Sequence, residues 1–206
     1  NLDKKEDNLL FEYYNLKIMW FICGLGNPGR KYKKTRHNLG FEILDSIVKK
    51  NNFQINKEDK NKILFKGNFG DNTCLFCKPM TFMNLSGQVI GKLVNYYKIP
   101  KSKIIIIHDD IDLMLGKIKI KTGGGSGGHN GISSIDNSIG KNYKRIRIGV
   151  GRPISKEFVS SFVLEKFNTF DREIIDSLIN KITNNFELMI NDESLFLTKI
   201  ALEIKK

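Results

Sequence analysis

The sequence predicts a single-domain α/β fold in which helices flank one central, twisted, mixed β-sheet. Apolar β-branched runs alternate along the chain with stretches of helical periodicity, which is typical of α/β proteins. The turn signal Gly70-Asp71-Asn72 lies between two strand-like runs and adds an antiparallel hairpin to the sheet. A chain of 206 residues is also long enough to bury one core without disulfides or metals.

The spacing of apolar residues places the individual elements. Strands are expected where β-branched residues run together or alternate with polar ones, and helices where apolar residues recur every three to four positions. The expected strands are Lys17–Gly24, Lys62–Asn68, Thr73–Lys78, Ile104–Ile107, Gly116–Lys121 and Arg145–Gly149. The expected helices are Asn38–Asn51, Ser86–Tyr97, a helix from about Gly131 to Ile139, Asp171–Ile190 and Glu193–Ile204.

Three of these elements have features that define their surroundings. Ile104–Ile107 is a continuous β-branched run, which is typical of a parallel strand covered on both faces. Gly116–Lys121 alternates lysine with apolar residues, so Lys121 and its neighbours should share one exposed face. Ser86 is the expected N-cap of its helix, at the end of the irregular loop Lys78–Ser86.

Composition excludes several classes of protein. A hydrophobic content of 40% with 27% charged residues argues against disorder, and no apolar run approaches the roughly 18 residues of a membrane span. Three cysteines give no disulfide framework, which favours a reducing compartment. Cys74-x-x-Cys77 lies within an expected strand, where residues three apart face opposite sides, so core cysteines are favoured over a redox or zinc site. Residues 1–16 have no packed pattern and are expected to form a disordered or peripheral extension.

The net charge of +12 is concentrated in one region. Between Lys117 and Arg152 there are eight basic residues and one acidic residue, a net charge of +7. Between Asn168 and Lys206 there are five basic and seven acidic residues, a net charge of −2. A regional basic patch indicates a polyphosphate or nucleic-acid surface, although a solvated lysine-rich surface is an equal alternative on charge alone.

The stretch Gly24–Gly40, GLGNPGRKYKKTRHNLG, combines a Gly- and Pro-rich turn with basic residues and His37. Such a turn brings backbone and short polar groups close to a ligand. Its first part matches the dinucleotide fingerprint G-x-G-x-x-G. Pro28 and a basic run occupy the place where the helix of that motif should begin, however, and the required acidic residue is absent. A dinucleotide site is therefore disfavoured.

All three histidines, His37, His108 and His129, fall at predicted strand ends or in loops, where α/β proteins bind ligands. Together with nearby aspartates they could form a metal site, but their spacing matches no common one, and asparagine amides predominate among their polar neighbours. Ser126, within GGGSGGHNG, lacks the strand-to-helix context of a nucleophilic serine. Asparagine amides serve better as oxyanion donors and substrate holders than as zinc ligands, so the residues favour a substrate site over a metal site.

Five motifs, in this order and spacing, resemble the bacterial-type peptidyl-tRNA hydrolase family: GLGNPGRKYKKTRHNLGF, KPMTFMNLSG, HDDID, GGGSGGHNG and RIRIGVGRP. The resemblance covers the chain from about Ile18 to Ile204. It implies a monomeric α/β hydrolase that cleaves the ester between a peptide and the 3′ ribose of tRNA, recycling tRNA from stalled or dropped-off translation. It implies no metal, no cofactor, no covalent intermediate and no membrane. Residues 17–206 would form the catalytic domain, in the cytoplasm, with an organelle as the alternative because of the extension.

The resemblance also implies roles for individual residues. His37 would be the general base, oriented by Asp109, and Asn27 and Asn84 would hold the peptide end and the developing oxyanion. Asn130, beside His129, would position substrate and water. The remaining implied contacts are Tyr32, Phe82 and Met83 in the cleft and Lys121 and Arg147 on the 5′ phosphate of the tRNA.

Two other functions stay open. The chain could be an RNA-binding module without chemistry, which the presence of His37, Asp109 and Asn84 argues against. It could also be a metal-dependent hydrolase built on the His/Asp cluster, which activity in the presence of a chelator would exclude.

Overall fold

The computed structural model describes residues 19–202 and contains one seven-stranded mixed sheet. Its strand order is β2-β3-β4-β1-β5-β7-β6. Strands β4, β1, β5 and β7 are parallel, whereas β2, β3 and β6 pair antiparallel to their neighbours. The strands are β1 (Trp20–Gly24), β2 (Gln54–Asp59), β3 (Lys62–Phe69), β4 (Asn72–Pro79), β5 (Ile104–Asp110), β6 (Ile118–Thr122) and β7 (Lys144–Gly149).

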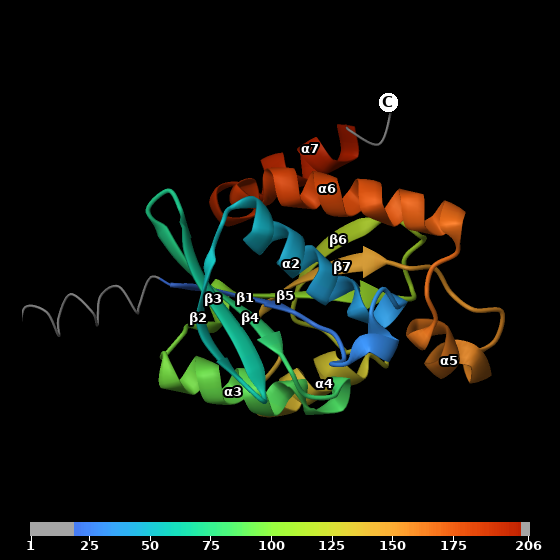
Figure 1. Ribbon diagram of the computed structural model, residues 1–206, viewed down its shortest axis with the longest axis horizontal. Helices are drawn as coiled ribbons and strands as arrows, with labels where there is room; N and C mark the ends of the chain where they lie inside the picture. The colour runs from blue at the N-terminus through green and yellow to red at the C-terminus, as the bar shows by residue number, and fades with distance from the viewer. Residues whose placement is uncertain (1–18, 203–206) are drawn as a thin grey trace, which may run out of the picture.

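Helices cover both faces of the sheet, so the predicted fold class is confirmed. Figure 1 shows α2, α6 and α7 on one face, α3 and α4 on the other, and α5 at one end of the sheet. No helix within the described residues is both long and apolar enough to cross a bilayer. The helices are α2 (Leu39–Lys50), α3 (Ser86–Tyr96), α4 (Asn130–Ile139), α5 (Val159–Leu164), α6 (Thr169–Asn191) and α7 (Glu193–Leu202).

Two apolar cores lie on the two faces of the central strands. Ile105 and Ile107 of β5 pack in the core under α2 and α6, while Ile104 and Ile106 pack in the core under α3 and α4. Complete burial of all four explains the uninterrupted β-branched run of this strand. The prediction for the cysteines is also confirmed, because Cys74 and Cys77 are buried, free and divided between the two cores.

Backbone contact between β1 and α2 positions the turn that lies between them. The amide of Leu25 donates to the carbonyl of Ile107 at 3.0 Å, and the amide of Phe41 donates to the carbonyl of Leu25 at 3.1 Å. A Cβ atom on Gly40 would lie 2.3 Å from the Ile107 carbonyl oxygen, and one on Gly24 would lie 2.2 Å from the Gly40 oxygen. Glycine at both positions therefore lets the start of α2 reach the end of β5.

Two elements were not predicted, and one predicted detail is wrong. Strand β2 is an edge strand of polar, exposed residues, and α5 is six residues long, so neither shows a clear apolar period. Ser86 is not an N-cap: it is the first residue of α3, and Leu85 precedes it as the cap. The 3₁₀ turn Met83–Leu85 runs directly into α3, and the amide of Gly87 donates instead to Oγ of Ser134 at 3.0 Å. The prediction for residues 1–16, with Lys17 and Ile18 of the first expected strand, lies outside the described residues.

Candidate active site

A cavity of about 910 Å³ opens at the carboxyl ends of the parallel strands, the edge at which α/β sheets bind ligands. The cavity is lined by the segments after β1 and β4, the end of β5 and the glycine-rich loop that leads into α4. The rest of the lining belongs to the wall segment, defined as residues 152–164, which includes α5. Eight residues predicted for the site line this cavity: Asn27, His37, Phe82, Met83, Asn84, Asp109, His129 and Asn130.

His37 and Asp109 form a buried pair at the base of the cavity. Nδ1 of His37 lies 2.9 Å from both carboxylate oxygens of Asp109, and the two residues are 7% and 1% exposed. A carboxylate only accepts hydrogen bonds, so Nδ1 carries the proton and Nε2 keeps its lone pair. The pair therefore presents His37 as a base that can take a proton at Nε2.

Opposing influences set the charge of this pair. Burial is the largest influence on His37 and disfavours its charged form, but the charge and hydrogen bond of Asp109 outweigh it, so the pKa of His37 is raised above 6.5. Burial is likewise the largest influence on Asp109 and acts to raise its pKa. His37 and His129 outweigh it, so the pKa of Asp109 lies well below its usual range. An ionised Asp109 can thus stabilise the imidazolium that His37 becomes during proton transfer.

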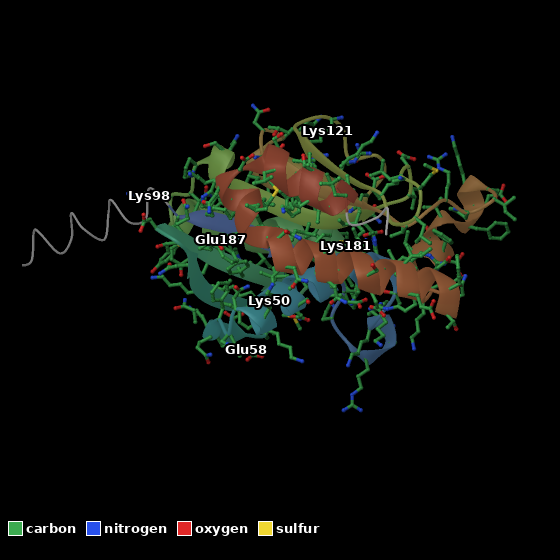
Figure 2. The ribbon with its side chains drawn as sticks, turned by 90° about the horizontal axis from the view of Figure 1, so that it is seen from above. Lys50, Glu58, Lys98, Lys121, Lys181 and Glu187 are labelled. Carbon is green, nitrogen blue, oxygen red and sulfur yellow. The ribbon has the colours of Figure 1, made fainter. Side chains whose placement is uncertain are left out.

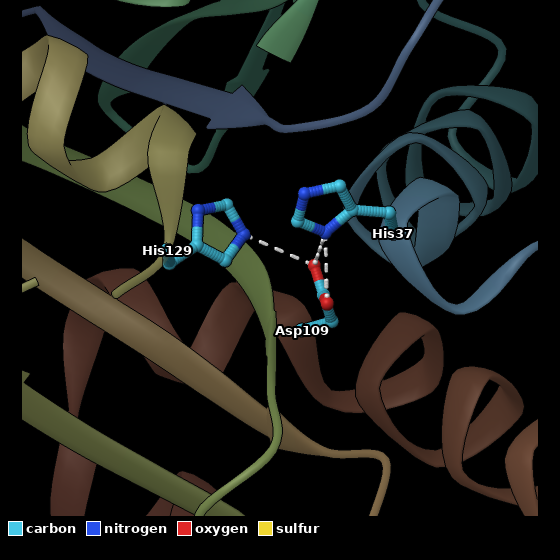
Figure 3. Close-up of side chains that lie close together, drawn as sticks. All are labelled: His37, Asp109 and His129. Carbon is cyan, nitrogen blue, oxygen red and sulfur yellow. Dashed lines mark hydrogen bonds and ion pairs between the residues drawn. The ribbon is translucent and has the colours of Figure 1, made fainter. Parts of the chain in front are cut away.

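His129 connects the same carboxylate to helix α4. Its Nε2 lies 3.1 Å from Oδ1 of Asp109, and its ring lies 4.6 Å from that of His37 between centroids. Figure 3 shows the two rings converging on Asp109 from separate segments of the chain. His129 is also the N-cap of α4, because its Nδ1 accepts hydrogen bonds from the amides of Gly131 and Ile132.

This cap bears on whether the cluster could hold a metal ion. His37, Asp109 and His129 each offer one ligand atom within 4.8 Å of the others, a spacing that could hold a cation. Since Nδ1 of His129 accepts two amide hydrogens, Nε2 must carry the proton of the neutral ring. A metal ion needs the lone pair of that nitrogen, so binding there would break the helix cap. The side chains therefore fit a hydrogen-bonded network better than a metal site.

His108 is part of the support of Asp109 and does not line the cavity. It is 3% exposed, and its Nδ1 donates to the carbonyl of Asp109 at 2.6 Å. Burial, together with the nearby His129, lowers the pKa of His108 to about 3, so this ring is neutral at physiological pH. A neutral, buried donor to the backbone of Asp109 has a structural role.

Asn27 is held in a defined orientation by its neighbours. Its Oδ1 accepts from the amide of Met83 at 2.8 Å, which leaves its Nδ2 as a donor on the cavity side. Asn38 brackets the Asn27 backbone, with Oδ1 accepting from the Asn27 amide at 2.8 Å and Nδ2 donating to the Asn27 carbonyl at 2.9 Å. Asn38 was missed in the sequence, although it directly follows His37 in the motif RHN.

Three predicted residues lie outside the cavity lining. Tyr32 lies at the rim, with its ring 6.4 Å from that of Phe82 in an edge-on arrangement. Lys121 is exposed on β6 and lies at the periphery of the molecule in Figure 2. Arg147 is on β7, where its Nε lies 2.6 Å from Oδ2 of Asp110.

Four basic residues of β6 and β7 share one face of the sheet, because the two strands pair antiparallel with Lys119 opposite Arg147 and Lys121 opposite Arg145. They do not share one role. Arg145 is 2% exposed and donates to the carbonyls of Gly124 and Gly125, so it holds the glycine-rich loop. The expected pair of basic strands is present, but only part of its charge faces solvent.

The described geometry defines a class of protein: an α/β enzyme with an oriented histidine base, a buried carboxylate and amide groups in one cleft. Residues 21–205 match the family model described as "Peptidyl-tRNA hydrolase". The chain therefore belongs to the peptidyl-tRNA hydrolase family and is a hydrolase of that class, which confirms the resemblance.

Relatives and solved structures agree with this assignment. A peptidyl-tRNA hydrolase of Rickettsia bellii (strain RML369-C) is 50% identical over 177 residues, covering 85% of this chain and 95% of the relative. One of Mesorhizobium japonicum is 44% identical over 188 residues, covering 91% of this chain and 78% of the relative. The crystal structure of peptidyl-tRNA hydrolase from Acinetobacter baumannii superposes with a TM-score of 0.83 at 37% identity, covering 89% and 95% of the two chains.

Proposed function

We propose that this enzyme hydrolyses the ester between the peptide and the tRNA 3′ ribose of peptidyl-tRNA with a water molecule activated by His37. The observation that carries the proposal is the bond from Nδ1 of His37 to both oxygens of Asp109. It leaves Nε2 unprotonated at the cavity. Within the described residues, no serine or cysteine is hydrogen-bonded to His37, which favours water over a side chain as the nucleophile.

The reaction would proceed in two steps. Nε2 of His37 takes a proton from water while the hydroxide attacks the ester carbonyl carbon, and the carbonyl oxygen becomes an oxyanion. Nδ2 of Asn27 and the amide of Asn84, which both line the cavity, can donate to the peptide and to that oxyanion. When the tetrahedral intermediate collapses, the ribose 3′ oxygen leaves and takes the proton back from His37.

Asn130 would act on the substrate from the start of α4. His129 lines the same cavity, but Asp109 and the amides of α4 engage both of its ring nitrogens, so it would contact the substrate only through the carbon atoms of its ring. Asn130 is exposed at the first position of the helix, where its amide can position substrate and water. Phe82, 54% exposed, and Met83, 4% exposed, would form the apolar side of the cleft, with Tyr32 behind Phe82.

Lys121 and Arg147 would grip the 5′ phosphate of the tRNA. This assignment is supported by their shared strand pair and by the exposure of Lys121. A 5′ phosphate lies close to the 3′ ester in tRNA, so a pair of cations that binds this phosphate could select full-length tRNA. That the enzyme acts as a monomer in the cytoplasm stays a prediction.

The test is hydrolysis of purified peptidyl-tRNA by His37→Ala. Loss of a general base should lower kcat about 10²–10⁴-fold with little change in substrate binding. Lys49→Ala is a matched control, because Lys49 is exposed near the far end of α2 and should leave turnover unchanged. Near-normal turnover by His37→Ala would contradict the assignment of the base. A burst of released tRNA equal to the enzyme concentration would instead indicate an acyl-enzyme intermediate.

A further inference from the structure

Arg36 is a buried cation directly before the proposed base. Arg36 is 7% exposed, and its guanidinium lies over the rings of Phe162 and Phe167, with Cζ 3.9 Å and 5.1 Å from the two ring centroids. Glu165 is its acidic neighbour at 3.8 Å, but that side chain is 63% exposed, so the ion pair is weak. A charge removed from water in this way needs other partners.

Those partners are backbone carbonyls in the last turn of the wall segment and directly after it. Nη1 of Arg36 donates to the carbonyls of Phe162, Glu165 and Lys166 at 3.2, 3.4 and 3.3 Å. Phe162 lies in the last turn of α5, where its carbonyl also accepts from the amide of Glu165, and the other two carbonyls follow the helix directly. A cation suits the C-terminal end of a helix. The planar guanidinium can serve several carbonyls and stack on a ring at the same time, which an ammonium group cannot do.

Main-chain contacts join the same two segments, the turn that carries Arg36 and the residues after α5. The amide of Arg36 donates to the carbonyl of Glu165 at 3.0 Å, and Thr35 forms an isolated antiparallel bridge with Lys166. The turn that carries His37 is thereby joined, through main chain and side chain, to the C-terminal end of α5. These contacts are the direct connection between α5 and the segment that precedes the base.

The wall segment otherwise has few anchors in the core. Val163 is buried, Phe162 packs partly buried against the core under α2 and α6, and Arg152 pairs with Asp112. Ile154, Phe158 and Leu164, however, are 105%, 58% and 43% exposed. Figure 1 shows α5 apart from the sheet and from α6. Segments with few buried apolar contacts open at low free energy, so the bonds of Arg36 make a large share of what fixes this one.

The wall segment has the character of a peptide-binding surface more than of an RNA-binding one. Ile154, Val159, Val163 and Leu164 line the cavity together with Phe82. The charged residues of the wall segment in this lining are Arg152, which is paired with Asp112, and Lys156. The exposed lysines of β6, in contrast, are not among the residues that line the cavity. Given the proposed function, on which this inference rests, the apolar wall is where the peptide of the substrate would lie.

We propose that Arg36 is a positioning residue that holds the wall segment against the turn of His37 and thereby sets how tightly the peptide part of the substrate binds. It makes no contact with the reacting atoms. Loss of the Arg36 guanidinium would leave His37 and Asp109 hydrogen-bonded but would free the wall segment.

The first experiment is amide hydrogen exchange of the substrate-free protein, comparing Arg36→Met with the wild type. Removal of several charge-assisted hydrogen bonds should speed exchange of the amides in residues 159–165 by roughly 10-fold or more, while the buried middle of α6 exchanges as before. Arg172→Met is the matched control: Arg172 is another mostly buried arginine, which binds Glu42 and Asp176 and joins α6 to α2. It should loosen α6 and leave residues 159–165 unchanged.

The second experiment measures KM and kcat on two substrates, an N-acetyl-aminoacyl-tRNA and a peptidyl-tRNA that carries several residues. In Arg36→Met, KM for the longer peptide should rise by roughly 10-fold relative to KM for the acetylated substrate, with a smaller change in kcat. Arg36→Lys keeps the charge without the planar fork and should give an intermediate effect. Should Arg36→Met fail to fold, Arg36→Lys carries the same comparison.

The inference is overturned if exchange of residues 159–165 is unchanged in both Arg36 variants, or if KM changes equally for both substrates. The exchange measurement needs no turnover, so it remains valid even if His37→Ala shows that the proposed mechanism is wrong. A uniform loss of active enzyme, with the KM ratio of the wild type, would mean that Arg36 only stabilises the fold.

Discussion

Replacement of Asp109 by asparagine changes one atom of the carboxyl group and tests the proposed base most directly. Oδ1 of Asp109 accepts from both His37 and His129, and Oδ2 accepts only from His37. An asparagine can keep its oxygen in the first position, so the bond from Nε2 of His129 survives. The NH₂ group of the asparagine then takes the place of Oδ2, at hydrogen-bond distance from Nδ1 of His37. Because this NH₂ group and the protonated Nδ1 are both donors, they face each other without an acceptor.

This conflict is relieved when His37 moves its proton from Nδ1 to Nε2. The ring then has no lone pair facing the cavity and cannot take a proton from water. His129 cannot compensate by changing its own tautomer, because its Nδ1 caps α4. A wrong tautomer of the catalytic histidine lowers the rate by up to about 10⁴-fold in serine proteases, so we expect a loss of kcat of about 10²–10⁴-fold.

The same variant should move the pH dependence of the reaction. In the wild type, burial lowers the pKa of His37 but Asp109 raises it more, so the acid limb of kcat/KM should have its midpoint above 6.5. In Asp109→Asn the opposing influence of burial remains and the carboxylate charge is gone. The midpoint should therefore fall, although the activity that remains is small.

The pH dependence of the free energy of unfolding tests the same pair independently of turnover. Burial is the largest influence on Asp109 and would raise its pKa, but His37 and His129 reverse this, so the folded pKa lies below the unfolded value of about 3.9. Such a group stabilises the fold above its unfolded pKa, and this contribution is lost as pH falls through the folded pKa. The contribution of His37 to stability depends on pH in the opposite direction. Because the folded pKa of His37 is raised, His37 stabilises the fold below about pH 6.5, and this stabilisation is lost as pH rises through the folded pKa.

The assay is kcat/KM on peptidyl-tRNA between about pH 5 and pH 9 at constant ionic strength, together with urea unfolding over about pH 3 to 7. The wild type should lose free energy of unfolding below about pH 4 and Asp109→Asn should lose less of it. Wild-type rates in Asp109→Asn, or an acid limb displaced to higher pH, would refute the proposed role of the pair.

Three further predictions concern four single substitutions. Asn84→Ala should lower kcat by about 10²-fold or more with a smaller change in KM, since an oxyanion donor acts in the transition state; steady-state kinetics decide this, and an effect confined to KM would contradict it. Lys121→Ala should weaken tRNA binding and lower the slope of its salt dependence by about 1, and Arg147→Ala should do so less because Arg147 is paired with an aspartate. Equal slowing of a minimal 3′-end substrate and full-length tRNA by either variant would show that these residues do not grip the 5′ phosphate. Gly40→Ala should cost about 3 kcal/mol or more of unfolding free energy, because its Cβ would lie 2.3 Å from the carbonyl oxygen of Ile107; an unchanged urea midpoint would disprove this.

The sequence predicted which strands carry the site because that depends on local pattern. A β-branched run followed by His108-Asp109 indicates the carboxyl end of a buried parallel strand, and such ends meet at one edge of the sheet. Gly24 and Gly40 were visible as glycines, but the close approach that requires them appears only when α2 packs on β1. The sequence could thus predict that His37 lies near Asp109, but it could not predict the distances or the orientation of the two side chains.

Contacts between distant parts of the chain were beyond prediction from the sequence. The partners of Arg36 lie 126 to 130 residues away, and they are backbone carbonyls, which leave no trace in residue types. The cap formed by His129 is local, but histidine is not among the usual N-cap residues, so a propensity rule does not find it. The edge strand β2 and the short helix α5 were missed because a periodicity needs length and a buried face.

The charge count shows how folding redistributes a sequence property. Of the eight basic residues between Lys117 and Arg152, four are engaged with carboxylates of the protein: Lys144 with Glu193, Arg145 with Asp136, Arg147 with Asp110 and Arg152 with Asp112. The other four are exposed lysines: Lys117, Lys119, Lys121 and Lys141.

Three of those lysines lie on or beside β6, which is the edge strand of the sheet. Lysines on an edge strand also prevent pairing with the edge of another sheet, so their presence alone does not demonstrate a tRNA surface. The two explanations differ in what they require. Protection of the edge needs charge at any of the three positions, whereas a phosphate grip needs it at Lys121. If the lysines only protect the edge, Lys117→Ala and Lys121→Ala will affect tRNA binding equally, and a larger effect of Lys121→Ala on the salt dependence would identify the grip.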